Sequence, residues 1–277
     1  LKKSPDLLSA AYIEQELRTK GVNLKVKVEK KVDSTNNVLK QYIADGEKED
    51  MVLLAEEQSA GRGRRGRSFY SPQGTGLYMS LLLHPNATAE EGTMLTTLTA
   101  AAAAKAVEKV SGEETLIKWV NDVWMRGKKI SGILTEGSAS LEEGKLEYVI
   151  VGIGINIYEP VGGFPEEIKD AAGAVFTSHI QKENMRNRLA SEFIKNFMEY
   201  YNMLPSRNYL EEYRNRCFVI GKEVKIVTPD GSVHKAGEGA DRTSATVLGI
   251  DDACHLQVQY KDGTVEFLSS GEISIKV

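Results

Sequence analysis

The chain has few of the residues that hold secreted or metal-stabilised proteins together. Its 277 residues include only two cysteines, Cys217 and Cys254, so a disulfide framework is excluded, and no Cys and His spacing matches a zinc site. The longest apolar run, Leu98 to Ala104, is far too short to span a membrane, and the first residues contain no signal-peptide core. These absences predict a soluble protein of the reducing cytoplasm without a membrane partner.

An excess of positive charge is also missing. The 35 lysines and arginines are outnumbered by 39 aspartates and glutamates, which gives a formal net charge of -4. Dedicated nucleic-acid-binding domains are usually basic, so this balance argues against DNA as a partner. The length of the chain allows one large hydrophobic core together with a small second domain.

Against this background the chain carries one concentrated basic segment, here named the arginine loop: Gly61-Arg62-Gly63-Arg64-Arg65-Gly66-Arg67. Glycine permits backbone conformations that other residues avoid and lets a ligand approach the main chain closely. Guanidinium groups bind phosphate oxygens in bidentate fashion. On a mildly acidic protein, such a local cationic segment predicts a site for a small phosphate-bearing substrate.

Three other interpretations of the arginine loop have to be weighed. Residues 61–66 match the pattern G-x-G-x-x-G of dinucleotide-binding folds, yet Arg64 and Arg65 would crowd that crevice, and residues 68–76 do not begin a helix. RNA-binding Arg-Gly segments lie in disordered tails, whereas this loop lies between two strand-like stretches. A merely solvated basic loop stays open on the loop alone, so the rest of the chain has to decide.

Hydrophobic periodicity predicts an α+β architecture for most of the chain. Apolar residues at helical spacing indicate helices at about residues 7–20, 37–46, 88–110 and 184–204. Alternating or continuously apolar runs indicate strands at residues 23–32, 51–56, 77–83, 116–125, 129–135 and 147–158, with a hairpin turn at Arg126-Gly127. The last strand is apolar throughout, so both of its faces should be covered. We therefore expect a mixed or antiparallel sheet with helices packed on it.

The helical pattern stops after Cys217. Short alternating runs at residues 223–227, 245–249, 255–260 and 264–268 are separated by the turns Pro229-Asp230-Gly231 and Lys261-Asp262-Gly263. Roughly five short strands in such a short segment predict a small barrel. We therefore expect three parts: an N-terminal helix or linker at residues 1–22, a larger domain at 23–217 and a small barrel at 218–277.

Four short blocks stand in order along the chain: Asp33-Ser34-Thr35-Asn36, Gln58 with the arginine loop, Ile117-Lys118-Trp119-Val120-Asn121-Asp122 with Lys129, and Gly152-Ile153-Gly154-Ile155-Asn156. In this combination the chain closely resembles the biotin protein ligases, from residue 24 to residue 277. The resemblance implies a catalytic domain with the class II aminoacyl-tRNA synthetase-like biotin/lipoate ligase fold and an SH3-like C-terminal barrel. It also implies that ATP activates biotin to biotinyl-5′-AMP in the presence of Mg2+, and that a lysine of a biotin carboxyl carrier protein then accepts the biotin.

The resemblance assigns roles to residues in all four blocks. For biotin it implies Ser34, Thr35, Asn36, Gln58, Gly61, Arg62, Gly63, Arg64, Lys129, Gly152 and Gly154. For the nucleotide it implies Arg64, Arg67, Asn121, Asp122, Lys129 and Asn156. Arg64, Arg67 and Lys129 are expected to act in catalysis, and Asp122 to help place Mg2+. Both substrates are anionic, so fixed positive charge is needed to bring them together.

Several of these residues have a simpler alternative. Ser34 and Thr35 suit helix capping, which is compatible with facing a ligand. A hairpin lysine such as Lys129 is more often only solvated, and its neighbour Lys128 is an equally basic candidate. The pair Asn121-Asp122 also suits a turn at the end of a strand.

The glycines and one departure from the family pattern leave further questions open. Gly152 and Gly154 suit either a ligand that lies close to the strand or a tight crossing within the sheet. The family usually has proline where Val120 stands, and proline fixes φ, so the approach to Asn121 should be less constrained here.

Two further functions are compatible with the chain. A lipoate protein ligase shares the central architecture and the adenylate chemistry, although the complete arginine loop and the C-terminal barrel favour biotin. Some biotin ligases also carry an N-terminal winged helix-turn-helix and act as biotin-operon repressors, but about one helix precedes the first strand, which is too little for that domain. Residues 1–20 are then either a linker left by truncation or the start of a monofunctional enzyme. An exposed sheet edge would allow two subunits to pair as a homodimer.

Overall fold

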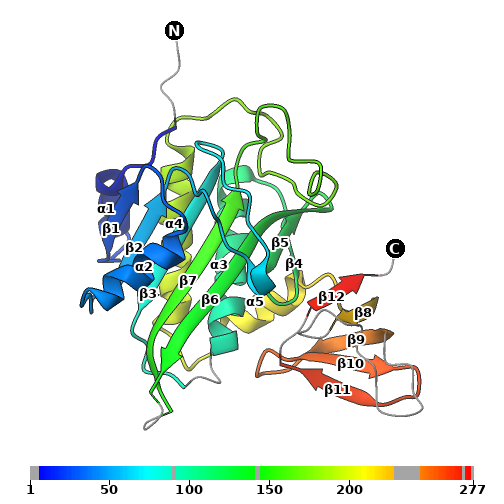
Figure 1. Cartoon of the computed structure of the whole chain (residues 1–277). Coiled ribbons are helices and arrows are strands. Elements are labelled where there is room, and N and C mark those ends of the chain that lie inside the picture. The colour runs from blue at the N-terminus through cyan, green and yellow to red at the C-terminus, as the bar shows by residue number, and fades with distance from the viewer. Residues whose placement is uncertain (1–5, 89–91, 141–143, 228–243, 270–271, 276–277) are drawn as a thin grey trace.

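Seven strands form the central sheet of the protein (Figure 1). The computed structural model describes residues 6–88, 92–140, 144–227, 244–269 and 272–275. The strands are β1 Lys25–Glu29, β2 Met51–Ala55, β3 Gly76–Leu83, β4 Leu116–Lys118, β5 Asp122–Met125, β6 Lys128–Ala139 and β7 Leu146–Asn156, in the spatial order β1-β2-β3-β7-β6-β5-β4. In this sheet β1 and β2 pair in parallel and the other neighbours pair antiparallel. The predicted mixed sheet is confirmed.

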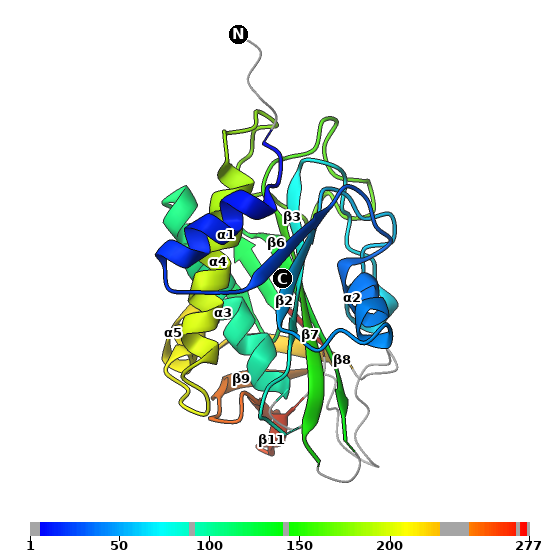
Figure 2. The ribbon, with the colours of Figure 1, turned by 90° about the vertical axis from the view of Figure 1, so that its left-hand side faces the viewer.

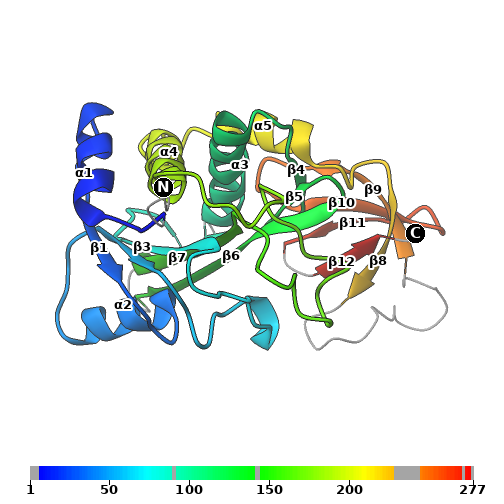
Figure 3. The same cartoon turned by 90° about the horizontal axis from the view of Figure 1, so that it is seen from above.

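Helices cover both faces of this sheet (Figures 2 and 3). One face carries α1 Ala10–Thr19, α3 Gly92–Ser111, α4 Met185–Tyr201 and α5 Tyr209–Arg216, whereas α2 Thr35–Ala44 lies on the opposite face. α3 packs on β5, β6 and β7 from one side, and α2 packs on β2, β3 and β7 from the other. Residues 149–155 of β7 are therefore all buried, as their apolar sequence predicts.

The central position of α3 depends on its small side chains. Ala100 to Ala104 are completely buried, and α4 and α5 both pack against this helix. Small side chains at such contacts allow helix axes to approach closely. The predicted start of the helix, at residues 88–91, lies partly outside the described residues. Although α3 has 20 residues, no helix in the part of the chain that the structure describes is long and apolar enough to cross a membrane.

One expectation about local structure was wrong, and one helix was not predicted. Residues 116–125 form two strands, β4 and β5, which fold back on each other so that Lys118 pairs with Asp122. The turn between them escaped detection because Trp119 and Val120 are buried apolar residues rather than turn formers. α5 was missed as well, because it is only eight residues long and is mostly charged.

The strands predicted after Cys217 are confirmed as a second, antiparallel sheet. They are β8 Glu223–Val227, β9 Ser244–Ile250, β10 Leu256–Tyr260, β11 Val265–Leu268 and β12 Glu272–Ile275, in the order β11-β10-β9-β8-β12. The loop between β9 and β10 contacts the central part of the protein. Arg214 Nε of α5 donates to the Ile250 carbonyl at 2.8 Å, and Trp119 Nε1 donates to the Cys254 carbonyl at 3.0 Å. The small sheet therefore supports the turn between β4 and β5.

A buried ion pair attaches the N-terminal segment to the sheet. Arg186 of α4 has no solvent exposure and pairs with Glu56, which follows β2. Its Nη1 also donates to the Asp6 carbonyl at 3.1 Å, and its Nε donates to the Gly76 carbonyl at 2.8 Å. Burial raises the pKa of Asp6, although hydrogen bonds from Tyr158 and the Arg186 backbone oppose the rise. One guanidinium thus joins α4, two strands and the N-terminal segment.

We expect Arg186→Leu to lower the free energy of unfolding by about 3–5 kcal/mol, because Glu56 would remain buried without a cation. The matched control is Arg188→Leu, two residues along the same helix, where the arginine is exposed. The control should unfold within about 0.5 kcal/mol of the parent protein. Urea unfolding followed by tryptophan fluorescence measures both variants. Equal stability of the two would show that the buried pair contributes nothing.

Candidate functional site

Two adjoining pockets lie along the central sheet, close to the arginine loop. The first, here named the anion pocket, encloses about 720 Å3 of partly open space. It is lined by Arg62, Gly63, Arg64, Arg65, Arg67, Ser68, Phe69, Lys118, Trp119, Asn121, Asp122, Lys129, Gly132, Ile133 and Ile273. The second, here named the polar pocket, is lined by Ser34, Thr35, Asn36, Gln58, Arg62, Phe69, Met79, Gly132, Leu134, Gly152, Ile153 and Gly154. Because Arg62, Phe69 and Gly132 line both, the two pockets adjoin each other.

The arginine loop folds back on itself through backbone hydrogen bonds. The Gly63 N–H donates to the Arg67 carbonyl at 2.7 Å, and the Phe69 N–H donates to the Gly61 carbonyl at 2.8 Å. A β-carbon at residue 61 would lie 2.4 Å from the Phe69 carbonyl oxygen, so only glycine fits there. Arg65 adopts the left-handed region at φ 55°, a conformation that costs a non-glycine residue about 1–2 kcal/mol. The loop is therefore a closed turn and not an extended basic segment.

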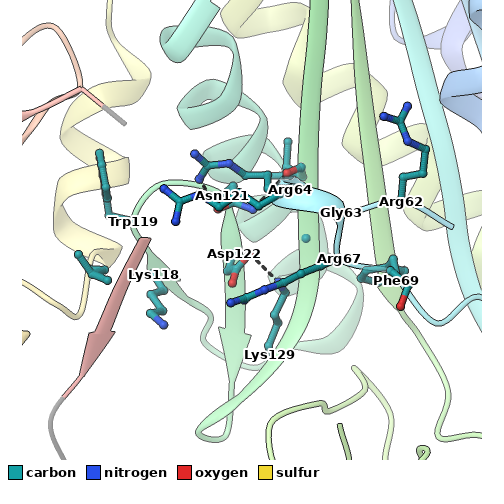
Figure 4. Close-up of a pocket in the computed structure, with 15 residues that line it drawn as sticks. Arg62, Gly63, Arg64, Arg67, Phe69, Lys118, Trp119, Asn121, Asp122 and Lys129 are labelled. Atoms are coloured by element: carbon teal, nitrogen blue, oxygen red, sulfur yellow. Dashed lines mark hydrogen bonds and ion pairs between the residues drawn. The ribbon is translucent and has the colours of Figure 1, made fainter. Parts of the chain in front are cut away.

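The anion pocket gathers positive charge on a protein that is negative overall. Of its described lining residues, six are cationic and one, Asp122, is acidic. Figure 4 shows Arg64, Arg67 and Lys129 around a common space, with Asn121 and Asp122 beside them. Such a density of lysine and arginine suits a ligand with several negative charges.

Two neighbouring polar residues hold these cations in place. Arg64 Nη1 donates to Asn121 Oδ1 at 3.1 Å, and Asn121 Nδ2 donates to the Ile133 carbonyl at 3.1 Å. Lys129 Nζ forms an ion pair with Asp122 Oδ1 at 2.7 Å. Asn121 and Asp122 follow the turn that the small sheet supports. Lys129 lines the anion pocket, whereas Lys128 Nζ donates to the Lys169 carbonyl at 2.9 Å. The role of Lys129 toward a ligand stays a prediction.

The polar pocket is built on a chain of hydrogen bonds between neutral side chains. Ser80 Oγ, on β3, lies 2.6 Å from both Thr35 Oγ1 and Asn36 Oδ1. The Thr35 N–H donates to Gln58 Oε1 at 2.9 Å, and Gln58 Nε2 donates to Ser71 Oγ at 3.0 Å. Ser34 is the N-cap residue of α2 but makes no side-chain capping bond, so the capping alternative does not occupy its hydroxyl.

Glu136 of β6 is the last member of this series of hydrogen bonds. Asn36 Nδ2 donates to Glu136 Oε2 at 2.8 Å, and Lys40 and Arg62 both pair with the same carboxylate. Burial by itself raises the pKa of Glu136, but the hydrogen bonds from Asn36 and Lys40 and the charges of Lys40 and Arg62 lower it below its ordinary value. Glu136 is therefore ionised at neutral pH and accepts hydrogen bonds without donating any.

The two glycines of β7 are covered by side chains of the protein itself. A β-carbon at Gly152 would lie 2.2 Å from Asn36 Oδ1, and one at Gly154 would lie 2.5 Å from the Phe69 ring. Neither alternative considered from the sequence included this contact with protein side chains. Both glycines also line the polar pocket, so a ligand close to the strand stays a prediction. These glycines let Asn36 and Phe69 rest directly on the sheet between the two pockets.

Two predicted site residues, Gly61 and Asn156, line neither pocket. The Asn156 Nδ2 donates to the Gly173 carbonyl at 3.0 Å. Gly173 belongs to the segment that runs beside β6, where the Lys129 N–H donates to the Ala171 carbonyl at 2.8 Å. In this structure Asn156 therefore braces the loop next to Lys129. Its contact with a nucleotide stays a prediction.

Several residues of the site were not predicted from the sequence. They are Phe69, Ser71, Ser80, Glu136, Lys118 and Trp119. Ser80 did carry a visible sign, since it is a polar residue within a fully buried strand. Lys118 and Trp119 stood in one of the quoted blocks but received no role. Among the described residues, no group of three or more His, Cys, Asp or Glu side chains is placed to hold a metal.

Comparisons with known proteins agree with this geometry. A model of the biotin/lipoate A/B protein ligase family matches residues 28–156. The bifunctional ligase/repressor BirA of Bacillus subtilis (strain 168) is 30% identical over 275 residues, which cover 98% of this chain and 80% of that protein. The biotin--[acetyl-CoA-carboxylase] ligase of Paracoccus denitrificans is 31% identical over 231 residues, covering 79% and 91%. The solved biotin protein ligase from Aquifex aeolicus in complex with biotin and ATP has a TM-score of 0.69 at 27% identity, covering 91% of this chain and 98% of that one.

The contact between Asn36 and Gly152 gives a direct test of the site geometry. In Gly152→Ala the new methyl group would displace the Asn36 amide, so we expect a loss of about 1–3 kcal/mol in the free energy of unfolding. Gly249→Ala on β9 is the control, because its added β-carbon meets no atom closer than 4.0 Å. Urea unfolding measures stability, and a crystal structure of the variant shows where Asn36 lies. An unmoved Asn36 in Gly152→Ala would contradict the close contact.

Proposed function

Because the chain belongs to the biotin protein ligase family, we propose that it activates biotin with ATP to biotinyl-5′-AMP and transfers the biotinyl group to a lysine of a biotin carboxyl carrier protein. The observation that carries this proposal is the adjacency of the two pockets. A hydrogen-bonding pocket lies next to a strongly cationic one, and Arg62, Phe69 and Gly132 line both. A molecule with a polar ring at one end and a carboxylate at the other would span the two pockets.

We assign the fused rings of biotin to the polar pocket. Its walls include Met79, Leu134 and Ile153, which suit the apolar part of the rings. The ureido group has two N–H donors and one carbonyl acceptor, and the side chains of Ser34, Thr35, Asn36 and Gln58 offer both kinds of partner. With the rings placed there, the carboxylate points toward the arginine loop, where Gly63 lines the anion pocket.

We assign ATP to the anion pocket. In the first step a biotin carboxylate oxygen attacks the α-phosphorus, the bond between this phosphorus and the bridging oxygen to the β-phosphate breaks, and pyrophosphate leaves. Arg64, Arg67 and Lys129 supply positive charge where the phosphate oxygens gain negative charge. Asn121 and Asp122 keep two of these cations oriented before the substrates bind. Little reorganisation is then needed during the reaction.

In the second step the amine of the carrier lysine attacks the acyl carbon of biotinyl-5′-AMP. The bond from this carbon to the phosphate oxygen breaks, AMP leaves, and the amine loses a proton to solvent. The same cations stabilise the phosphate of the leaving AMP. The names of relatives that act on acetyl-CoA carboxylase support a carrier domain of such a carboxylase as the acceptor.

Asp122 is the residue that we propose for Mg2+. This ion usually takes one or two protein carboxylates together with substrate phosphates and water, so a single carboxylate beside a phosphate site fits it. When bound, Mg2+ supplies additional charge neutralisation on the phosphates. Asp122 also pairs with Lys129, and both stay within reach of the same phosphates.

We further propose that the chain divides functionally near residues 22 and 217, with the small sheet supporting the nucleotide end. Ile273 of β12 lines the anion pocket, and the Cys254 carbonyl accepts the hydrogen bond from Trp119. Both cysteines are free and buried, which agrees with the reducing cytoplasm as the proposed location.

The proposed activity is tested by ATP-pyrophosphate exchange with Mg2+, comparing biotin, lipoate and no acid. We expect exchange with biotin alone, because the polar pocket offers partners for a ureido group that lipoate lacks. Exchange with lipoate alone would reassign the substrate to lipoate. Absence of exchange with either acid would refute adenylation at this site.

Lys129→Gln should lower the rate of exchange by roughly 100-fold to 1,000-fold, the usual effect of removing one preorganised charge donor. Lys128→Gln is the matched control and should retain the parental rate, because Lys128 faces the Lys169 carbonyl instead of the pocket. Biotin binding measured by calorimetry should also stay at the parental level in Lys128→Gln. A larger loss in Lys128→Gln than in Lys129→Gln would reverse the assignment.

Arg64→Gly should weaken retention of biotinyl-5′-AMP, so that free adenylate accumulates in solution and biotinylates unrelated proteins. Arg65→Gly provides the comparison, since glycine fits the left-handed backbone at that position without strain. Mass spectrometry of the filtrate measures released adenylate, and labelling of bystander albumin measures promiscuity. Equal release by the parent protein and Arg64→Gly would remove Arg64 from the adenylate site.

A further inference from the structure

We propose that Glu136 is a positioning residue for biotin, which acts by fixing the orientation of the Asn36 amide and by holding Arg62 against the polar pocket. The inference rests on the proposed function, because it concerns the ring end of the same substrate. Glu136 itself does not line the polar pocket and would not touch biotin. Glu136 belongs to β6, and its carboxylate contacts the amide nitrogen of Asn36.

The first step of the argument is the amide orientation of Asn36. The oxygen and nitrogen of an asparagine amide have nearly the same shape, so only hydrogen-bond partners decide which way the group faces. An ionised carboxylate accepts hydrogen bonds and never donates. Asn36 Nδ2 faces Glu136 Oε2 at 2.8 Å and, at the longer distance of 3.4 Å, the Leu134 carbonyl, so Oδ1 must face Ser80. Glu136 is the nearer and the charged acceptor of the two.

The second step follows the protons through Ser80 and Thr35. Asn36 Oδ1 can only accept, so the single hydroxyl proton of Ser80 is directed to it across 2.6 Å. The 2.6 Å contact between Ser80 and Thr35 then needs the Thr35 proton, because two hydroxyl oxygens this close repel each other without one. Thr35 therefore donates to Ser80 in preference to Gln58 Oε1, which is farther away at 3.2 Å. The oxygens of Asn36 and Thr35 then keep lone pairs for the N–H groups of a ureido ring.

The third step connects this pattern to the arginine loop. Arg62 Nη1 donates to Glu136 Oε2 at 2.8 Å and to Asn37 Oδ1 at 3.1 Å. Figure 4 shows Arg62 turned away from the space that Arg64, Arg67 and Lys129 share. The Glu136 carboxylate thus orients the Asn36 amide in the polar pocket and also holds Arg62 beside that pocket.

The competing explanation is that Glu136 only forms ion pairs at the surface. A change at Lys40 distinguishes this explanation from a positioning role. Lys40 Nζ pairs with Glu136 Oε1 at 2.8 Å, on the oxygen that does not contact Asn36. The Lys40 side chain is 41% exposed, and exposed ion pairs contribute little. Removal of Lys40 therefore tests the ion pair alone, while Asn36 keeps its partner.

The experiment compares Glu136→Gln with Lys40→Met in the ATP-pyrophosphate exchange assay and in calorimetric titration with biotin. A neutral glutamine no longer enforces the Asn36 orientation, so the biotin KM and Kd should rise roughly tenfold or more, the effect of one lost hydrogen bond. The KM for ATP should stay within about twofold, and Lys40→Met should keep the parental biotin KM. A biotin KM that is unchanged in Glu136→Gln, or raised equally in Lys40→Met, would overturn the inference.

A paired exchange of charge supplies the second test. Asn36→Asp alone places two carboxylates in contact and should raise the biotin KM more than Glu136→Gln does. In the double variant Asn36→Asp with Glu136→Gln, the amide of the introduced glutamine can donate to the introduced carboxylate, which restores an acceptor facing Ser80. We expect the biotin KM of the double variant to lie within a few-fold of the Glu136→Gln value, or below it. Strict additivity of the two single effects would show that orientation is not what Glu136 controls.

Failure of this inference differs from failure of the proposed function. If the parent protein neither binds biotin in the calorimeter nor shows biotin-dependent exchange, the proposed function and the role of Glu136 are both refuted. If the parent does both and Glu136→Gln matches it, the ligase assignment stands and only the role of Glu136 is lost. Thermal melting of each variant shows that the comparison is made on folded protein.

Discussion

The two pockets depend on two positions of β7 that carry no side chain. Gly152 allows the Asn36 amide to lie directly on the sheet, and Gly154 does the same for the Phe69 ring. Asn36 belongs to α2 and Phe69 follows the arginine loop, so these contacts bring both elements onto the same strand. A methyl group at either glycine would separate one of them from the sheet. The site is therefore defined by the close packing of protein groups, and the space that remains above them forms the polar pocket.

Charge is distributed unevenly over the molecule, and the site depends on this distribution. The protein is negative overall, yet six cations line the anion pocket. Asn121 and Asp122 orient Arg64 and Lys129, while Glu136 holds Arg62 on the opposite side of the loop. The acidic and amide groups thus hold Arg64 and Lys129 at the anion pocket and Arg62 beside the polar pocket. Like charges in a loop would otherwise repel each other and be solvated individually.

The sequence allowed much of this to be predicted, and the exceptions have physical causes. Periodicity located most of the strands, and the glycines and arginines of residues 61–67 predicted an anion site because both residue types have distinctive local chemistry. The turn at Trp119 was hidden because buried apolar residues form it. Glu136 was missed because its partner Asn36 lies 100 residues away, and such a contact exists only in the folded chain. Asn156 shared a block with Gly152 and Gly154, but in the structure its side chain braces a neighbouring loop. The functional roles of the site residues stay predictions.

The hydrogen bond from Trp119 to the Cys254 carbonyl also limits how the protein can be divided and recombined. The loop that contains Cys254 joins two strands of the small sheet, whereas Trp119 lies in the turn that leads to Asn121 and Asp122. A sequence change in one part therefore has to be tolerated by the other. The small sheet therefore cannot be exchanged between related proteins on its own. In evolution and in protein engineering it has to be kept together with the turn that it supports.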